Sequence, residues 1–168
     1  QSRVNGTLTY QGVKCYELQA SLNLDDNTRG RIEAQSKMYL TLDGIPLFYH
    51  LDMVINGESE SYEYIREGAR LRGGTAGEKS ILPVVKAAYF VEDDNPWQWD
   101  LVFRKQAFFT GMRREISVFN PQNGTLRQLQ IEVEDAEEIT VDAETFQCFR
   151  INVSGKLAWI SSVGWLIR

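Results

Sequence analysis

The chain contains a single histidine, His50, and this restricts the acid–base and metal chemistry that its side chains could perform. A zinc site built on two histidines is excluded, and no serine carries the supporting motifs of a Ser-His-Asp triad. His50 shares the polar side of an alternating strand pattern with Asp52, so we expect it to be solvated or hydrogen-bonded there. Nothing in the spacing favours a nucleophilic pair of His50 with Cys15 or Cys148. The sequence therefore predicts no catalytic residue and no cofactor.

Carboxylates gather in the stretch 132–138, where two could form a glycosidase pair and several could bind calcium. The stretch lacks the Asp-x-Asp-x-Asp-Gly pattern of a calcium loop. Its acidic residues would alternate outward beside the turn of a hairpin, and a charged strand edge that prevents aggregation explains them more simply. We predict no metal site, and we retain a carboxylate-dependent enzyme acting on a polysaccharide as an alternative function.

A glycine-rich segment, Gly73-Gly74-Thr75-Ala76-Gly77, has the composition of a loop that cradles phosphate. It lacks the Gly-Lys-Ser/Thr ending and the following helix of a P-loop. We therefore expect a plain, flexible loop at these residues.

Aromatic side chains suggest a different role, because they can either fill a core or line an apolar cavity. Several lie in and after a helix predicted at about residues 94–106, and others lie on the strands before it. A sheet that curves round a cavity, with the helix as its lid, would accept an acyl chain or an apolar segment of another protein. The candidate ligand-binding residues of that cavity are Trp97, Trp99, Phe103, Phe108, Tyr49 and Met53.

The composition fits one folded domain over residues 1–168, long enough for a sizeable core. Hydrophobic residues make up 43% of the chain and aromatic residues 11%, as in ordinary folded proteins. The net charge is −5 and no basic cluster stands out, so we expect no nucleic-acid partner. No apolar run approaches the roughly 18 residues of a membrane-spanning helix.

Alternating apolar and polar residues predict the strands that must position these side chains. The first half reads as a meander of strands at residues 14–24, 31–42, 46–55, 58–66 and 69–72. Among its turns, Asn56-Gly57 is the strongest hairpin signal. The last third reads as short strands at residues 113–119, 125–133, 136–141, 146–153, 157–160 and 165–168. Strands at this spacing indicate an antiparallel sandwich or barrel, so the predicted fold class is mainly β.

One short helix interrupts the strands. Asp94-Asn95-Pro96 is its predicted start, with a capping side chain followed by proline at a position where the missing N–H does no harm. Helical periodicity continues to about Gln106, and the apolar surface is wide for so short an element. We expect the helix to lie on the concave face of the sheet or to cap an open barrel end.

The two cysteines, Cys15 and Cys148, share no Cys-x-x-Cys spacing, so neither a redox motif nor a zinc motif is indicated. They would act as half-buried small hydrophobic residues, or they would form a disulfide in an exported protein. The sequence leaves both alternatives open.

The second half of the chain resembles a widespread family of bacterial envelope proteins of uncharacterised function. The resemblance covers about residues 93–168, with an apolar–arginine–apolar strand after Ala143-Glu144-Thr145-Phe146 and a tryptophan-containing strand near the end. Glu144 departs from the pattern, because the family usually has glycine there. The matching segments are 93–95, 97–103, 110–111, 114–119, 126–133, 138–141, 143–151, 158–160 and 164–168.

That family is similar in fold to the lipoprotein carriers LolA and LolB, whose half-open antiparallel barrel wraps a helical lid. The resemblance implies an antiparallel half-open β-barrel with the helix on its concave face. It also implies an extracytoplasmic location, periplasmic or associated with the envelope, and it brings no catalytic residues. The expected function is a non-enzymatic protein that binds a lipid, an acyl chain or another apolar ligand, or another envelope protein. A structural module of a larger surface protein is a further alternative.

Overall fold

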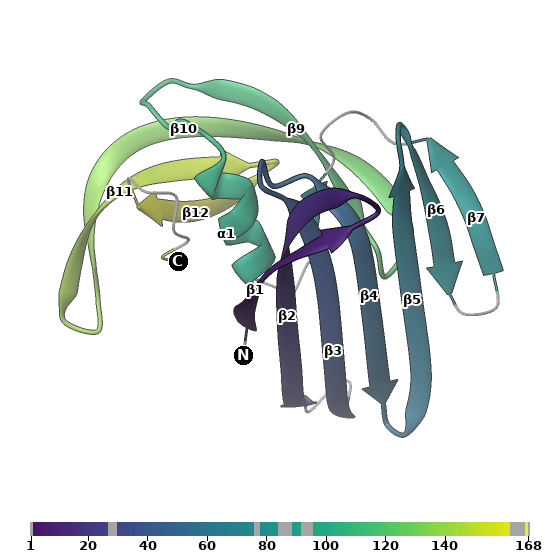
Figure 1. The fold of residues 1–168 in the computed structure, drawn as a ribbon. Helices are drawn as coiled ribbons and strands as arrows, with labels where there is room; N and C mark the ends of the chain where they lie inside the picture. Colours follow the sequence, from purple (N-terminus) through teal and green to yellow (C-terminus); the bar gives the residue numbers. More distant parts are fainter. Residues whose placement is uncertain are drawn as a thin grey trace. The chain divides into compact units, whose positions relative to one another are not determined.

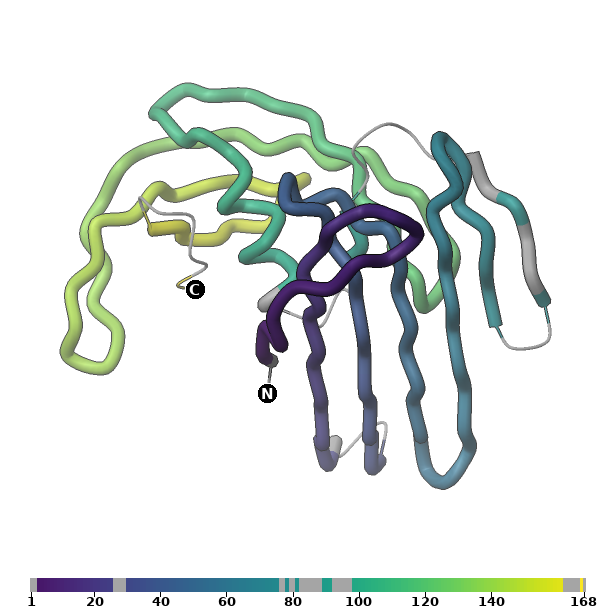
Figure 2. Tube along the Cα trace, viewed as in Figure 1, coloured from purple at the N-terminus to yellow at the C-terminus, as the bar shows by residue number. Residues whose placement is uncertain are grey.

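The computed structural model describes residues 2–26, 30–75, 78–83, 89–91, 96–161 and 167. Its strands form a seven-stranded and a five-stranded sheet, both rich in antiparallel pairs, and one helix accompanies them (Figure 1). The mainly β class predicted from the sequence is confirmed. Consecutive strands of the seven-stranded sheet run in opposite directions, as the trace in Figure 2 shows. No helix in the described residues has both the length and the apolar character needed to cross a membrane.

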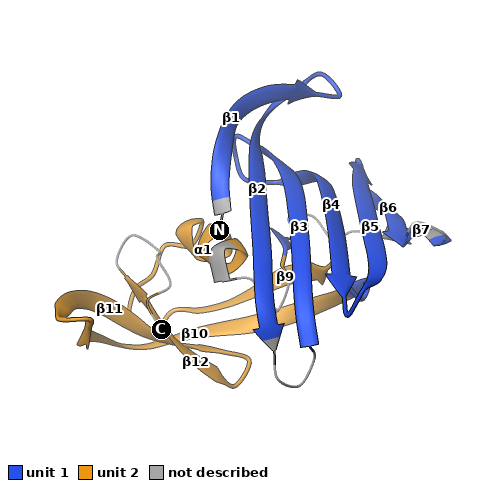
Figure 3. Ribbon diagram, turned by 90° about the horizontal axis from the view of Figure 1, so that it is seen from below, with its two compact units in different colours: residues 1–90, 121–125 blue, residues 91–120, 126–168 orange. Residues whose placement is uncertain are grey.

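The chain divides into two compact units (Figure 3). Unit 1 comprises residues 1–90 and 121–125, and unit 2 comprises residues 91–120 and 126–168. The seven-stranded sheet belongs to unit 1, and the helix belongs to unit 2. The expectation of one domain over residues 1–168 stays a prediction.

The sheet of unit 1 is a meander in which each strand pairs with the next. Its strands are β1 (Ser2–Tyr10), β2 (Val13–Asp26), β3 (Gly30–Thr41), β4 (Pro46–Ile55), β5 (Glu58–Glu67), β6 (Arg70–Thr75) and β7 (Glu78–Pro83). The short β8 (Tyr89–Phe90), which follows in the chain, is not a strand of this sheet. The alternation predicts β2 to β6 and misses the edge strands β1 and β7. In β1 the pattern is interrupted at Gly6, where a bulge shifts the register against β2.

The core of unit 1 follows one row of cross-strand neighbours. Leu18 pairs with Met38, Met38 with Tyr49, and Tyr49 with Tyr64. All four side chains are buried, and Phe90 packs edge-on against Tyr49 with ring centroids 6.0 Å apart. The apolar faces predicted for β2, β3 and β4 are therefore confirmed along this row. Each such side chain stabilises the fold by about 1.5–3 kcal/mol through burial.

The prediction of a glycine-rich loop is wrong for its first half. The segment 73–75 ends β6 and pairs with both β5 and β7, and the two residues after it lie outside the described residues. Glycine is required because the backbones approach closely: a Cβ on Gly73 would lie 1.9 Å from the carbonyl oxygen of Glu63. Glycine within a strand marks such close approaches, and its composition alone does not distinguish them from a loop.

Unit 2 contains α1 (Pro96–Arg104), β9 (Arg113–Asn120), β10 (Thr125–Val141), β11 (Glu144–Val153) and β12 (Lys156–Ser161). Only Thr125, the first residue of β10, is assigned to unit 1. These strands follow the order β12-β11-β10-β9 in the second sheet. The predicted break at 133–136 is wrong, because β10 is a single strand of 17 residues. A bulge between Val133 and Asp135 takes up the extra residue against β11, and no glycine, proline or asparagine favours a turn there. The predicted last strand, 165–168, falls outside the described residues except for Ile167.

The helix α1 is close to the prediction, since it ends at Arg104 rather than Gln106. Gln106 satisfies carbonyls of the last turn that have no partner within the helix. Its backbone N–H donates to the Phe103 carbonyl at 2.8 Å, and its side-chain amide donates to the Val102 carbonyl at 3.2 Å. Val102 and Phe103 are buried, which confirms the apolar stripe. The predicted capping residues before Pro96 lie outside the described residues.

Both cysteines are free thiols, and both are buried rather than half-buried. The Sγ of Cys15 donates weakly to the Leu8 carbonyl oxygen at 3.6 Å, between neighbouring strands. Desolvation, and after it the negative charge of Glu137, raises the pKa of the Cys148 thiol. The structure therefore favours the hydrophobic alternative over the disulfide.

Two-residue hairpin turns with positive φ at both residues recur in the described chain, and they are typical of the type I′ turn. They are Gln11-Gly12, Asn56-Gly57, Asp142-Ala143 and Ser154-Gly155. The predicted Asn56-Gly57 hairpin is confirmed. Asp142-Ala143 differs from the other three because alanine, at φ 67°, takes the second place.

Replacing Ala143 with glycine is expected to raise the free energy of unfolding by about 1 kcal/mol, because the left-handed region costs a non-glycine residue about that much. The melting temperature should rise by about 2–4 °C in a thermal unfolding experiment. Gly155→Ala is the matched control, since Gly155 takes the second place of the next hairpin at φ 93° and should lose stability. An unchanged melting temperature in Ala143→Gly would contradict the strain assigned to this turn.

Candidate functional site

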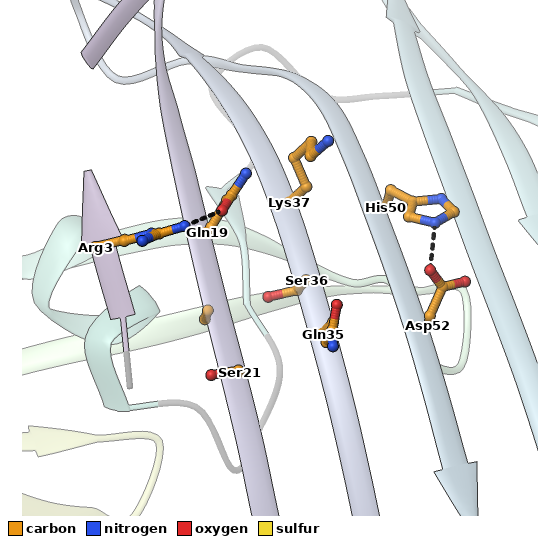
Figure 4. A pocket seen from close by; sticks show the side chains of 9 residues that line it. Arg3, Gln19, Ser21, Gln35, Ser36, Lys37, His50 and Asp52 are labelled. Atoms are coloured by element: carbon orange, nitrogen blue, oxygen red, sulfur yellow. Dashed lines mark hydrogen bonds and ion pairs between the residues drawn. The ribbon is translucent and has the colours of Figure 1, made fainter. Parts of the chain in front are cut away.

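A groove on one face of the unit 1 sheet is a candidate site with a defined volume and lining. The groove has a volume of about 590 Å³, which is within the range of small-molecule pockets. It lies across β1, β2, β3 and β4, and Figure 4 shows its side chains. The residues that define this polar groove are Arg3, Gln19, Ala20, Ser21, Gln35, Ser36, Lys37, His50 and Asp52.

The register of neighbouring strands places the central side chains of the polar groove in one row. Gln19 of β2 pairs with Lys37 of β3, and Lys37 pairs with His50 of β4. Paired residues point to the same face of a sheet, so the three lie next to one another. Arg3 extends the row from β1, because it pairs with Gln19 and its Nη2 donates to Gln19 Oε1 at 3.1 Å (Figure 4).

His50 and Asp52 are hydrogen-bonded to each other at one side of the groove. His50 Nε2 lies 2.9 Å from Asp52 Oδ2, which confirms the hydrogen-bonded role predicted for His50. Desolvation alone would raise the pKa of Asp52. Hydrogen bonds from Ser61 and His50, with the charge of His50, outweigh it, so the pKa of Asp52 lies below its ordinary value.

Replacing Ser61 with alanine is expected to raise the pKa of Asp52, because it removes a hydrogen bond that stabilises the carboxylate. The folded pKa is depressed, so the stability that Asp52 contributes is present above its unfolded pKa of about 3.9 and is lost as the pH falls through the folded value. An NMR titration of the Asp52 carboxyl carbon between about pH 2 and pH 6 measures the shift. Ser59→Ala, an exposed serine on the same strand, is the control. An Asp52 midpoint that stays the same in Ser61→Ala would contradict the assigned cause.

An aromatic cluster borders the polar groove. The ring centroids of Tyr10 and Tyr39 lie 5.0 Å apart and those of Tyr39 and Phe48 lie 4.9 Å apart. Phe48 stacks on His50 with ring centroids 6.4 Å apart, so His50 belongs to both the cluster and the groove. Sequence reasoning places Tyr39 and Phe48 on strands and misses Tyr10, because β1 is not among the predicted strands.

On the opposite face of the same sheet, Leu22, Ala34 and Met53 are successive cross-strand neighbours and form the apolar row. A cavity of about 690 Å³ is lined by these three residues and by Glu60 of β5, and also by residues of the polar face, of which Ser21, Gln35 and Asp52 line the polar groove as well. Leu22 is 45% exposed and Leu24 is 43% exposed, although Leu18 on the same face of β2 is only 5% exposed. The apolar face of β2 is therefore covered near Leu18 and open near Leu22.

Four of the predicted cavity residues, Trp97, Trp99, Phe103 and Phe108, belong to unit 2. Trp99 and Phe103 stack with ring centroids 5.8 Å apart, and Phe103 and Phe108 lie 6.2 Å apart. Phe108 in turn lies 6.2 Å from Phe149 of β11. The predicted grouping of Trp99, Phe103 and Phe108 is confirmed, and the side chain of Trp97 lies outside the described part of the chain. Their role as ligand contacts stays a prediction.

The other two predicted cavity residues, Tyr49 and Met53, belong to unit 1 and lie on the same face of β4. Tyr49 is fully buried in the core row, against Phe90. Met53 is half-buried and lines the cavity of the apolar row. A ligand role stays a prediction for both, and the geometry supports it for Met53.

The acidic side chains of β10 are each held by a side chain of another strand. The pairs are Glu132 with Arg113, Glu134 and Asp135 with Arg150, Glu137 with Trp159 and Glu138 with Gln147. The predicted turn beside these residues is wrong, because β10 continues through them. Within the described ranges, no group of three or more His, Cys, Asp or Glu side chains is placed to hold a metal ion. These carboxylates therefore stabilise the sheet through cross-strand pairs, and their arrangement gives no support to a glycosidase pair.

Sequence reasoning identifies the His50–Asp52 pair but misses Arg3 and Lys37 as site residues. Arg3 has no predicted position because β1 is not predicted. Lys37 is correctly placed on the polar face of its strand, but its position beside His50 depends on a register shift between Tyr39 and Leu40. The alternation itself contains no signal for that shift, because the pattern on β3 continues unchanged through it.

Comparison with known proteins supports the fold alone. No family model matches the chain, and no curated protein matches it either. The chain is similar over 100% of its length to 88% of the chain in the crystal structure of a DUF1089 family protein from Pseudomonas aeruginosa, with a TM-score of 0.54 and 12% sequence identity. At 12% sequence identity the similarity shows that the two proteins have similar folds. The function must therefore be argued from the residues of this chain.

Proposed function

We propose that this chain is a non-enzymatic binding protein of the cell envelope that holds a lipid, an acyl chain or another apolar ligand on the apolar row. The observation that carries the proposal is the contrast along β2. Leu18 is 5% exposed, whereas Leu22 and Leu24 on the same face are 45% and 43% exposed. Apolar side chains that stay open on a face otherwise used as core are typical of a binding surface.

A cavity lined in part by the apolar row supports the proposal by its size. Its volume of about 690 Å³ is within the range of pockets that bind small molecules. Leu22, Ala34 and Met53 provide an apolar row, and Glu60 of β5, the cross-strand neighbour of Met53, provides a polar group at its side. A ligand with an apolar body and a polar end would contact both the apolar row and the polar group beside it.

The envelope location and the LolA/LolB-like half-open barrel, with α1 as a lid, belong to the same proposal. Their support is the resemblance of about residues 93–168 to a family of bacterial envelope proteins. A non-enzymatic role is supported by the carboxylates of β10, because each of Glu132, Glu134, Glu137 and Glu138 is held by a side chain of another strand. Fractionation of cells that express the full gene tests the location, and a protein found only in the cytoplasm would overturn it.

The binding test is a titration with the apolar dye 1-N-phenylnaphthylamine, followed by dye fluorescence and competed with palmitate. We expect a saturable rise in fluorescence that palmitate reverses. A Leu22→Asn, Met53→Asn double variant should weaken dye binding about tenfold or more, because it removes apolar contacts worth about 1.5–3 kcal/mol for each fully buried side chain.

Leu42→Asn is the matched control for this titration. The exposed fraction of Leu42, 48%, is close to the 45% of Leu22. Leu42 directly follows β3, at the other end of the sheet from the apolar row. Its substitution should leave dye binding unchanged. Wild-type affinity in the double variant, or an equal loss in Leu42→Asn, would show that the apolar row is not the site.

A further inference from the structure

We propose that the polar groove is a second binding site, for a small organic anion whose carboxylate or phosphate is held by Lys37 and Arg3. The polar groove lies on the face opposite the apolar row, because Lys37 and Ala34 are an odd number of positions apart on β3. Ser21, Gln35 and Asp52 line both cavities, but Arg3 and Lys37, which carry the anion site, line only the polar groove. The anion site therefore does not rest on the proposed function, and either can fail without the other.

Lys37 is the first observation behind the anion site. Its side chain is half-buried on the middle strand of the polar groove, between Gln19 and His50 (Figure 4). Among the residues that the structure describes, no hydrogen-bond or ion-pair partner is found for its ammonium group. A half-buried ammonium has lost part of its hydration, and a bound anion would compensate it.

Arg3 brings a second positive charge to the same side of the groove. One N–H of its guanidinium donates to Gln19, and the group has five donors in a planar fork that matches a carboxylate or a phosphate. Glu17, two residues before Gln19 on β2, accepts hydrogen bonds from Gln19 at 2.7 Å and from Asn5 at 2.9 Å. Within the described part of the chain neither Arg3 nor Lys37 forms an ion pair, so both positive charges remain available to a ligand.

The charge changes sign across the polar groove. Asp52 on β4 is paired with His50, and Glu63 on β5 is the cross-strand neighbour of His50. Within the groove lining, the positive side chains Arg3 and Lys37 thus lie on β1 and β3, the negative side chain Asp52 lies on β4, and Glu63 lies beyond it on β5. A ligand with its anionic group at Lys37 and hydroxyl donors toward Asp52 complements both sides, and such complementarity also orients the ligand.

The remaining lining suits a hydroxylated body. Gln35 contributes an amide, and Ser21 contributes a hydroxyl, between the two charged sides. The volume of about 590 Å³ is sufficient for a molecule of the size of a hexose. Phe48, stacked on His50, adds an aromatic surface at the border of the groove. The ligand class that fits these features is a sugar acid or a sugar phosphate.

The test is isothermal titration calorimetry of the whole chain with galacturonate, galactose 6-phosphate, neutral galactose and inorganic phosphate. We expect one site for at least one of the two charged sugars, about tenfold tighter than galactose or more, and weaker at higher salt. The ratio between galacturonate and galactose 6-phosphate then identifies which anionic group the site prefers. Inorganic phosphate should bind more weakly than the preferred charged sugar, because it lacks the hydroxylated body.

Substitutions of single lysines distinguish anion binding at the polar groove from a general effect of the protein's net charge. Lys37→Gln should lose about tenfold in affinity for the charged sugar or more, and Lys37→Arg should retain most of it. Lys14→Gln removes the same charge from an exposed position on β2 outside the groove and should change nothing. Dye binding at the apolar row should be unaffected by Lys37→Gln, which keeps the two sites distinguishable.

Three outcomes would overturn the anion site. Galactose could bind as tightly as the charged sugars, Lys37→Gln could bind like the wild type, or none of the probes could bind. Inorganic phosphate binding as tightly as galactose 6-phosphate would overturn the part that assigns Gln35 and Asp52 to a hydroxylated body.

Discussion

Replacing Gly73 with alanine is expected to lower the free energy of unfolding by roughly 3 kcal/mol. Gly73 of β6 pairs with Tyr64 of β5, and a Cβ there would lie 1.9 Å from the Glu63 carbonyl oxygen and 2.7 Å from the Tyr64 Cα. Both atoms belong to the backbone, so no side-chain rotation relieves the overlap. The two strands must separate locally, and the hydrogen bonds of their ladder weaken as they do.

Urea unfolding followed by circular dichroism measures this loss. Gly6→Ala separates the cost of the steric overlap from the cost of the backbone conformation, because both glycines have positive φ. Gly6 lies in β1 at φ 123°, where a Cβ would meet nothing within 4 Å. Its substitution should cost only the roughly 1–2 kcal/mol of an unfavourable backbone conformation. Equal losses in Gly73→Ala and Gly6→Ala would show that the close approach of β5 and β6 is not what requires Gly73.

The features of the fold that could be predicted are those that a single strand determines by itself. Period-two alternation identifies the faces of β2, β3 and β4 because side chains alternate along any strand, whatever its partner. The bulge of β10 between Val133 and Asp135 exists only against β11, so no local pattern marks it. Gly73 shows the same limit, because a glycine-rich segment is compatible both with a loop and with two closely paired strands.

The candidate sites also divide into features that one strand determines by itself and features that depend on its partners. His50 and Asp52 lie on one strand and one face, so their contact could be predicted from the sequence. Lys37 lies beside His50 only because the register of β3 and β4 shifts at a bulge, and this needs the pairing of both strands. Whether Leu22 is covered is a property of everything packed on its face, since its own alternation is the same as that of Leu18.

That difference in exposure predicts that leucine-to-alanine substitutions at Leu18 and Leu22 lower the free energy of unfolding by very different amounts. Leu18→Ala removes a side chain that is 5% exposed and should lower the free energy of unfolding by about 2–5 kcal/mol. Leu22→Ala removes one that is 45% exposed on the same face and should cost about 1 kcal/mol or less. Urea unfolding without ligand measures both values, and Leu18→Ala is the positive control for the method.

The same pair of variants links stability to binding. A ligand that binds only the folded state raises the free energy of unfolding in proportion to the logarithm of its concentration over Kd. Palmitate should therefore stabilise the wild type and Leu18→Ala to a similar extent and stabilise Leu22→Ala less. If Leu22→Ala loses as much stability as Leu18→Ala in the absence of palmitate, Leu22 is part of the core in solution and β2 has no open apolar surface. If instead Leu22→Ala is nearly as stable as the wild type and palmitate stabilises both equally, the surface is open but palmitate binds elsewhere.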